Sequence, residues 1–368
     1  MKKIQKELLA SLIEKRAKSD LAKCNIGGAE IQVFQDGELV YKNRFGAADL
    51  KEKELSDRTL FRLASMTKPI TAAAAMILVD RGLLSLSDRV DRFYPAFSDM
   101  AVFGSDEKNA VGITVEHLLT HTSGIGSGEA WVESCKSLTD GDKSCVESFI
   151  SFLSRQPLSF LPGTKQEYSG IGAFSVLTGI IQKITAMPYP DFLKKEIFEP
   201  CGMTDTTFTP TEEEWANLIA MHAKSDGKST VGTTFDGCIF ESFPPESYLG
   251  GAGLVSTADD YMRFAKMLLA GGISDGRRIL SEAAVCEIKR PRFEMSDEEW
   301  WGLGVRVVTR SNPIPIGSYG WSGAYGTHCF IDPENKIIGI YMKNSRHDGG
   351  SGAVTSKNLE IDICASLK

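Results

Sequence analysis

The chain centres on Phe61-Arg-Leu-Ala-Ser65-Met-Thr-Lys68-Pro69, followed directly by Ile70-Thr-Ala-Ala-Ala-Ala-Met-Ile-Leu-Val79. The second run carries no charge and contains four consecutive alanines, so it predicts a buried helix around which other elements can pack closely. Proline is tolerated in a helix only in the first turn, which places the helix start at about Ser65. Gly82 suits its C-terminal end.

Ser65 and Lys68 are three residues apart, so at a helix start their side chains share one face. Serine is a poor nucleophile unless a nearby base takes its proton, and lysine is such a base only when desolvation or nearby positive charge lowers its pKa. The uncharged helix can supply the desolvation, and a helix N-terminus favours developing negative charge. Ser-x-x-Lys is common by chance, so a capping serine beside a surface lysine is the alternative for this motif alone.

The composition is that of a globular protein, with 42% hydrophobic and 24% charged residues in 368. The net charge of −7 argues against nucleic acid or an anionic membrane as a partner. The longest apolar run, Pro69 to Val79, is too short to span a bilayer, and Leu8 to Ile13 is too short for a signal-peptide core. Eight cysteines lie scattered with no C-x-x-C pair, which favours reduced thiols over disulfides or a zinc site. We therefore expect a cytoplasmic protein.

Strand patterns lie towards the two ends of the chain. Ala29–Gln35 and Glu38–Phe45 are joined by Asp36-Gly37, a strong two-residue hairpin turn. Near the C-terminus, Tyr325–Ile331 and Ile337–Met342 are predicted to pair across a second turn. We expect one sheet built from both termini.

Helical patterns open the chain and dominate its middle. The first helix is predicted to bury one stripe: Ile4, Leu8, Leu12 and Ile13. The expected fold class is α/β (α+β), with an antiparallel sheet flanked by helices in residues 1–85 and 190–368 and an all-helical domain inserted at 86–189.

Three other patterns imitate known sites. Gly320-Trp-Ser322-Gly-Ala324 is close to the G-x-S-x-G nucleophile elbow, but its last residue is alanine and a strand is predicted to follow. Gly227-Lys-Ser229 resembles the end of a phosphate-binding loop, but His222 stands where the first glycine belongs. His117 and His121 have the i, i+4 spacing of metal ligands, yet no third ligand is near in sequence. We expect structural roles for all three, and neither a metal nor a cofactor.

Several further motifs accompany Ser65. In chain order they are His117-Leu-Leu-Thr-His-Thr-Ser-Gly-Ile125, Tyr168-Ser-Gly170, Gly250-Gly-Ala-Gly-Leu-Val-Ser-Thr257 and Trp321-Ser-Gly323-Ala-Tyr-Gly326. Together with Phe61–Pro69, the set closely resembles the serine β-lactamase and penicillin-binding-protein superfamily over nearly the whole chain. The class C-like branch is the most similar; it includes class C β-lactamases, DD-peptidases, D-aminopeptidases and family VIII carboxylesterases.

The resemblance implies an active site in the groove between the α/β domain and the helical domain. It implies that Ser65 is the acylated nucleophile, Lys68 its general base, and Tyr168 the residue that passes a proton to the leaving group and helps activate the deacylating water. The backbone N–H groups of Ser65 and Ala324 would form the oxyanion hole, each such donor being worth roughly 3–4 kcal/mol. A tyrosine shuttle needs its pKa, normally about 10, lowered, and we expect a neighbouring lysine cation to do this.

Two departures from the superfamily pattern point towards uncharged substrates. The second motif is usually Tyr-x-Asn, but Gly170 offers no side chain to the lysine or the substrate. The third is Lys-Thr-Gly in β-lactamases, but here it is Trp321, Ser322 and Gly323, similar to family VIII esterases. Losing that cation removes about 1.5–3 kcal/mol of carboxylate binding, whereas an indole offers apolar contact.

We therefore expect a serine hydrolase acting through an acyl-enzyme on small uncharged esters. The residues expected to bind substrate are Gly170, Trp321, Ser322 and Gly323. The alternatives are a β-lactamase, a D-aminopeptidase or DD-peptidase-type amidase, or a catalytically silent binding protein on the same fold. The acyl group, the leaving group and the oligomeric state do not follow from the sequence.

Overall fold

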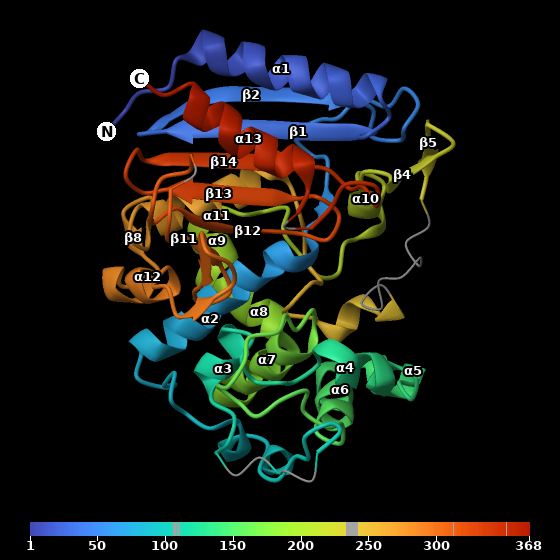
Figure 1. Cartoon of the computed structure of the whole chain (residues 1–368), viewed down its shortest axis with the longest axis vertical. Coiled ribbons are helices and arrows are strands. Elements are labelled where there is room, and N and C mark those ends of the chain that lie inside the picture. Colours follow the sequence, from blue (N-terminus) through green and yellow to red (C-terminus); the bar gives the residue numbers. More distant parts are fainter. Residues whose placement is uncertain (106–107, 109–110, 233–241, 312, 351) are drawn as a thin grey trace.

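The computed structural model describes residues 1–105, 108, 111–232, 242–311, 313–350 and 352–368. Its main strands are β1 (Gly28–Gln35), β2 (Glu38–Gly46), β9 (Phe293–Glu294), β10 (Glu299–Trp301), β11 (Arg306–Val308), β12 (Tyr319–Ser322), β13 (His328–Asp332) and β14 (Ile337–Met342). Within these residues they form one 8-stranded sheet in the order β2-β1-β14-β13-β12-β11-β10-β9 (Figure 1). All neighbours are antiparallel, and N-terminal β1 pairs with C-terminal β14. The predicted antiparallel sheet from both termini is confirmed.

The two predicted turns differ in outcome. Asp36 and Gly37 join β1 to β2 with φ angles of 47° and 94°, the left-handed pair that a two-residue hairpin turn requires. The predicted strand Tyr325–Ile331 instead begins at His328. Tyr325 lies in the tight turn from β12 to β13, which is closed by Gly323 N–H donating to Thr327 O at 2.7 Å.

Helices cover both faces of the sheet. On one face lie α1 (Lys6–Ala22) and α13 (Val354–Ala365), and on the other α11 (Ala258–Leu269) packs against β1, β13 and β14 (Figure 1). The predicted buried stripe of the first helix is half right: Ile4 and Ile13 are buried, but Leu8 is 39% exposed and Leu12 is half-buried, and Leu9 and Ala17 are buried in their place. The reason is that Ile4 lies outside the helix, bridging to Leu367, so it does not set the helical register.

Two further groups of elements complete the described residues. The remaining helices are η1 (Ala64–Met66), α2 (Thr67–Asp80), η2 (Val90–Arg92), η3 (Pro95–Phe97), α3 (Val115–Leu119), α4 (Gly128–Cys135), α5 (Asp140–Lys143), α6 (Val146–Leu153), α7 (Gly172–Thr185), α8 (Tyr189–Leu193), η4 (Lys194–Phe198), α9 (Glu199–Cys201), α10 (Glu212–Trp215), η6 (Pro245–Ser247) and α12 (Glu282–Ile288). The short strand pairs are β3 (Phe61–Arg62) with β6 (Val255–Ser256), β4 (His222–Ser225) with β5 (Lys228–Val231), and β7 (Ile273–Ser274) with β8 (Arg277–Arg278).

Helix α2 runs between the sheet layer and the helices α3 to α7 (Figure 1). Its four alanines, Ala72 to Ala75, are all 0% exposed, so neighbouring elements do pack closely around them as predicted. One continuous apolar core extends from α2 into α6 and α7. Because the helices at 86–189 share this core with α2, their assignment to a separate inserted domain stays a prediction.

The structure also bears on the expected reduced cysteines and on the absence of a membrane-spanning segment expected from the sequence. The seven cysteines among the described residues are free thiols, and the eighth, Cys238, lies outside those residues. No helix in the part of the chain that the structure describes is long and apolar enough to cross a membrane.

Candidate active site

Ser65 lies in the 3₁₀ turn η1, just before α2 begins at Thr67. The first hydrogen bond of this turn runs from Met66 N–H to Leu63 O at 3.1 Å, so the N–H of Ser65 precedes the helical hydrogen-bond ladder. Ala64 has φ +46°, a left-handed conformation that alanine rarely adopts. It is held there by a buried contact cluster with Met221 and Tyr325. Strain of this kind, about 1–3 kcal/mol, persists where surrounding packing enforces it and often marks a functional turn.

Lys68 is completely buried beside Ser65. Its Nζ lies 3.2 Å from Ser65 Oγ and donates to the carbonyl oxygens of Gly170 at 2.6 Å and Gly251 at 2.8 Å. Burial holds the pKa of Lys68 well below its usual range. A neutral amine has two N–H groups and one lone pair; here two carbonyls take the N–H groups, leaving the lone pair for the Ser65 hydroxyl. The arrangement is therefore that of a base aimed at Ser65.

Tyr168 is the second side chain in contact with Ser65 Oγ. Its hydroxyl donates to Ser65 Oγ at 2.8 Å, and it accepts from the indole N–H of Trp321 at 3.3 Å. Lys68 Nζ lies 4.8 Å from the centre of the tyrosine ring. Desolvation raises the pKa of Tyr168 to about 12, so the predicted lowering of this pKa by a lysine cation is wrong. The reason is that burial favours a neutral Lys68, and no cation then stabilises the phenolate.

Gly170 presents backbone where the superfamily pattern has an asparagine side chain, and Gly251 presents a second backbone carbonyl to Lys68. The contact with Lys68 that an asparagine amide would make at position 170 is made by the carbonyl of Gly170 itself. A Cβ on Gly251 would lie 2.9 Å from Gly170 O and 3.4 Å from Lys68 Nζ, so a larger residue would crowd the base. A Cβ on Gly170 would meet nothing within 4 Å, so this position faces open space.

Strand β12 carries Trp321 and Ser322, whose side chains point to opposite faces. Trp321 is only 6% exposed and packs edge-on against Trp301, with ring centroids 4.5 Å apart. Ser322 is buried, and its hydroxyl pairs with His328 Nδ1 at 2.8 Å. Strand β13 comes next after Ser322, as predicted, so the strand–turn–helix context of a nucleophile elbow is missing. A substrate contact from Ser322 would have to use its backbone, and that role stays a prediction.

Gly323 connects β12 to the nucleophile turn. A Cβ there would lie 2.2 Å from both Leu63 O and Thr327 Oγ1, so only glycine fits. The Thr327 hydroxyl also donates to Leu63 O at 2.9 Å. This close approach brings the start of the β12–β13 turn, and with it Ala324, alongside the backbone that leads into Ser65. The oxyanion hole of Ser65 and Ala324 stays a prediction.

His121 and Trp301 form an aromatic support for Tyr168 that was missed from the sequence. The His121 ring lies 4.5 Å from the Tyr168 ring and 4.7 Å from the Trp301 ring, centroid to centroid. His121 Nδ1 accepts from Ser169 N–H at 3.1 Å, which ties it to the loop before α7. Burial, and then the nearby Lys68, hold the pKa of His121 well below its usual range, which favours the neutral imidazole. In the sequence, His121 is marked by its metal-ligand spacing and by its place in the motif His117–Ile125, but neither signal gives it this role, and no pattern indicates Trp301.

The other imitations of known sites have structural explanations. His117 accepts from Thr114 N–H at 3.2 Å as part of the N-terminal cap of α3, and this helix ends at Leu119, before His121. Gly227 lies in the turn of the β4–β5 hairpin, not between a strand and a helix as a phosphate-binding loop requires. Among the described residues, no three potential ligands gather into a metal site.

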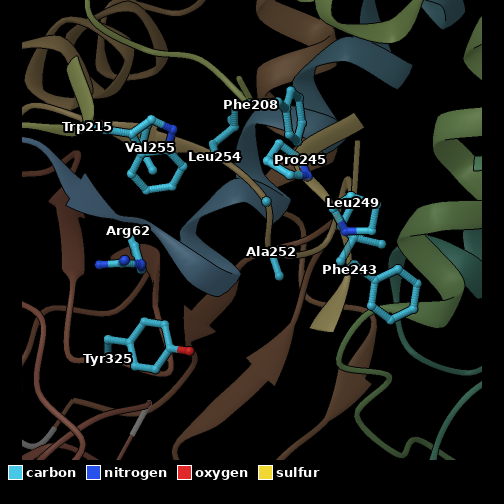
Figure 2. A pocket seen from close by; sticks show the side chains of 12 residues that line it. Arg62, Phe208, Trp215, Phe243, Pro245, Leu249, Ala252, Leu254, Val255 and Tyr325 are labelled. Atoms are coloured by element: carbon cyan, nitrogen blue, oxygen red, sulfur yellow. The ribbon is translucent and has the colours of Figure 1, made fainter. Parts of the chain in front are cut away.

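A pocket of about 280 Å³ lies beside this group of residues (Figure 2). Its lining is mainly apolar and consists of Arg62, Phe208, Trp215, Phe243, Pro244, Pro245, Leu249, Ala252, Gly253, Leu254, Val255 and Tyr325. Ala252 follows Gly251, which binds Lys68, and Tyr325 follows Ala324 and packs on Ala64. The pocket therefore borders the backbone that surrounds Ser65.

Comparison with known proteins agrees with this geometry. The family model described as beta-lactamase matches residues 9–360. The chain belongs to the beta-lactamase family. Within it, protein Rv1367c from Mycobacterium tuberculosis is 33% identical over 350 residues, covering 86% of this chain and 85% of that protein. Esterase EstB from Burkholderia gladioli is 30% identical over 365 residues, covering 89% and 88%.

The fold is shared with solved structures of the same kind. EstCE1, described as a hydrolase with promiscuous acyltransferase activity, matches with a TM-score of 0.84 at 23% identity, covering 98% of this chain and 99% of that one. This confirms the fold expected from the motifs. The chain is a serine hydrolase of the beta-lactamase family.

Proposed function

We propose that the protein is an esterase that cleaves small uncharged esters through an acyl-enzyme on Ser65. The observation that carries the proposal is the setting of Lys68, which is buried, faces Ser65 Oγ at 3.2 Å and has both amine N–H groups occupied by carbonyls. A lysine in this state accepts a proton at neutral pH, which ordinary surface lysines do not.

In acylation, Ser65 transfers its proton to Lys68 Nζ as Oγ forms a bond to the ester carbonyl carbon. The N–H groups of Ser65 and Ala324 stabilise the resulting oxyanion. Collapse of this intermediate breaks the bond to the leaving oxygen, which takes a proton from Tyr168. Tyr168 regains a proton from the Lys68 ammonium, so the acyl-enzyme forms with both groups neutral. The raised pKa of Tyr168, about 12, changes the role expected from the sequence: the phenol stays protonated and acts as the proton donor to an alkoxide, not as a phenolate base.

In deacylation the same groups act in reverse. A water molecule loses its proton to the neutral Lys68–Tyr168 pair as its oxygen attacks the acyl carbon. The bond to Ser65 Oγ then breaks, and Oγ takes the proton back.

Two features favour uncharged esters over β-lactams and D-Ala-D-Ala peptides. Trp321 occupies the place of the lysine that holds a substrate carboxylate, and Gly170 supplies no amide for a polar acyl side chain. We also propose that the pocket in Figure 2 receives an apolar part of the ester, against Phe208, Trp215 and Phe243. Aromatic walls bind such groups through buried area.

The first experiment is active-site labelling with a fluorophosphonate probe. The wild type should be labelled at Ser65, and Ser65→Ala should not be labelled. Ser322→Ala is the matched control, because it is also a serine beside the site but is hydrogen-bonded to His328; it should be labelled normally. Labelling lost in Ser322→Ala and kept in Ser65→Ala would refute the proposal.

The second experiment separates the substrate classes. Purified protein is profiled with short-chain aryl esters, D-amino-acid amides and a chromogenic cephalosporin. We expect kcat/KM to be highest for the esters. Comparable or higher efficiency on the cephalosporin or the amides would replace the esterase with a β-lactamase or an amidase, and labelling without turnover of any of them would favour a silent binding protein.

The location and partners of the enzyme, and its division into domains, are also proposals. The net charge of −7 and the scattered thiols support a cytoplasmic enzyme with small-molecule partners and no nucleic acid. Recovery of the native protein in the membrane or secreted fraction of its cells would contradict this. Residues 86–189 are proposed to form the inserted helical domain, and limited proteolysis that fails to cut near either boundary would argue against it.

A further inference from the structure

A second pocket, of about 600 Å³, lies away from the catalytic group. It is lined by Phe34, Asp36, Gly37, Cys201, Arg263, Lys266, Met267, Leu269, Ala270, Ile273, Ser274, Asp275, Pro333 and Lys336. None of these residues lines the pocket in Figure 2. The two pockets lie towards opposite ends of strand β13. The turn before β13 carries Ala324, near the catalytic group, whereas Pro333 and Lys336 of the second pocket follow its C-terminal end. The volume is within the range of small-molecule sites.

Lys266 is the unusual group in this pocket. Its Nζ lies 4.4 Å from the centre of the Phe34 ring, and within the described residues it has neither a hydrogen-bond nor an ion-pair partner. The other two cations in the wall are already paired: Lys336 with Asp36 at 2.9 Å, and Arg263 with Asp260 at 2.7 Å. Partial burial and the neighbouring Arg263 cation lower the pKa of Lys266, and the charges of Asp259 and Asp275 offset this only in part.

The rest of the wall beside Lys266 is largely apolar. Met267 and Cys201 are 1% and 2% exposed, and Phe34, Leu269 and Ile273 add aliphatic and aromatic surface. A ligand that fits must therefore combine one anionic group with an apolar body. Asp275 lies exposed on the rim, and Asp36 already serves two lysines. These two carboxylates disfavour a multiply charged group such as a phosphate dianion.

We propose that this pocket binds an apolar monocarboxylate, with the carboxylate on Lys266 and the hydrocarbon body against Phe34, Met267 and Ile273. A charge-assisted hydrogen bond supplies the anchor, and burial of the apolar chain supplies further affinity. The site is distinct from the ester site and does not depend on the identity of the catalytic residues.

Octanoate is the probe for the test, with octanol as its uncharged counterpart. Isothermal titration calorimetry should show saturable octanoate binding with a Kd below about 1 mM. Lys266→Gln should weaken octanoate binding about tenfold, the loss expected when a charged hydrogen bond is removed, and should leave octanol binding unchanged. Lys183→Gln is the matched control, because Lys183 also lies over an aromatic ring, that of Tyr94, but on α7 away from the pocket.

A variant that binds octanoate more tightly is also needed, because misfolding could explain a loss of binding but not a gain. Asp275 has φ +45°, a conformation that asparagine tolerates, so Asp275→Asn removes a repelling charge without backbone cost. It should tighten octanoate binding about two- to threefold at low salt. A diazirine analogue of octanoate should cross-link to α11 or β7. The proposal is overturned by binding that Lys266→Gln leaves unchanged, by no tightening in Asp275→Asn, or by cross-links confined to the pocket of Figure 2.

Discussion

Replacing Trp321 by phenylalanine tests whether this residue orients Tyr168 or contacts substrate. The change keeps an aromatic ring packed near Trp301 and removes the N–H that donates to Tyr168 Oη at 3.3 Å. A long hydrogen bond between neutral groups is worth about 0.5–1.5 kcal/mol. The lost bond should therefore lower the rate of the proton-transfer step by roughly two- to tenfold.

The size of this loss in rate should depend on the leaving group of the ester. Phenolate leaves without assistance, so kcat for an aryl ester should change little, whereas an alkyl ester needs the proton from Tyr168 and should lose the full two- to tenfold. KM should be nearly unchanged for both, since Trp321 is only 6% exposed and offers little surface to a ligand. Steady-state kinetics on an aryl ester and an alkyl ester that share the same acyl group gives kcat and KM for each.

Trp215→Phe is the matched control for Trp321→Phe. Trp215 lines the pocket in Figure 2 and takes no part in the hydrogen bonds around Ser65, so its replacement should raise KM for both esters equally. Trp321→Phe would refute the orienting role if it raised KM for both esters while the ratio of their kcat values stayed at the wild-type level. In that event Trp321 would be the apolar substrate contact that the sequence suggested.

Three further changes test the proton chain around Ser65. Tyr168→Phe should lower turnover of alkyl esters by at least ~10²-fold while the protein still folds, and near-normal rates on both alkyl and aryl esters would rule out the shuttle. Lys68→Met should abolish turnover yet raise the melting temperature at neutral pH. The pKa of Lys68 is lowered in the folded state, so below about pH 10.5 the unfolded chain binds a proton more tightly than the folded chain does, and this destabilises the wild-type fold. This gain should shrink as the pH rises towards 10.5, and a gain independent of pH would contradict the burial argument. Gly170→Asn enters open space and restores the usual amide, so the ratio of kcat/KM for a cephalosporin to that for an ester should rise; an unchanged ratio in a folded, labelled variant would show that position 170 does not face the acyl group.

Features that depend on neighbours along the chain could be predicted from the residues alone. The Asp36-Gly37 turn needs two left-handed residues, and the order of the motifs around Ser65 placed the chain in its family. The register of α1 is an exception. Leu9 rather than Leu8 faces the sheet in α1, because the sheet selects which side of an amphipathic helix is covered.

The hydrogen-bond partners of the candidate site residues, and the pKa of Tyr168, depended on tertiary structure. The partners of Lys68 come from Gly170 and Gly251, far apart in sequence, and their backbone carbonyls are invisible to any side-chain motif. Substrate binding by Trp321 stays a prediction, but its hydrogen bond to Tyr168 was not foreseen; it forms because β12 ends against the turn that holds Ser65. The residue types around Ser65 therefore indicated the chemistry and the lowered pKa of Lys68, but the raised pKa of Tyr168 followed from desolvation, which is set by what the fold packs around the phenol.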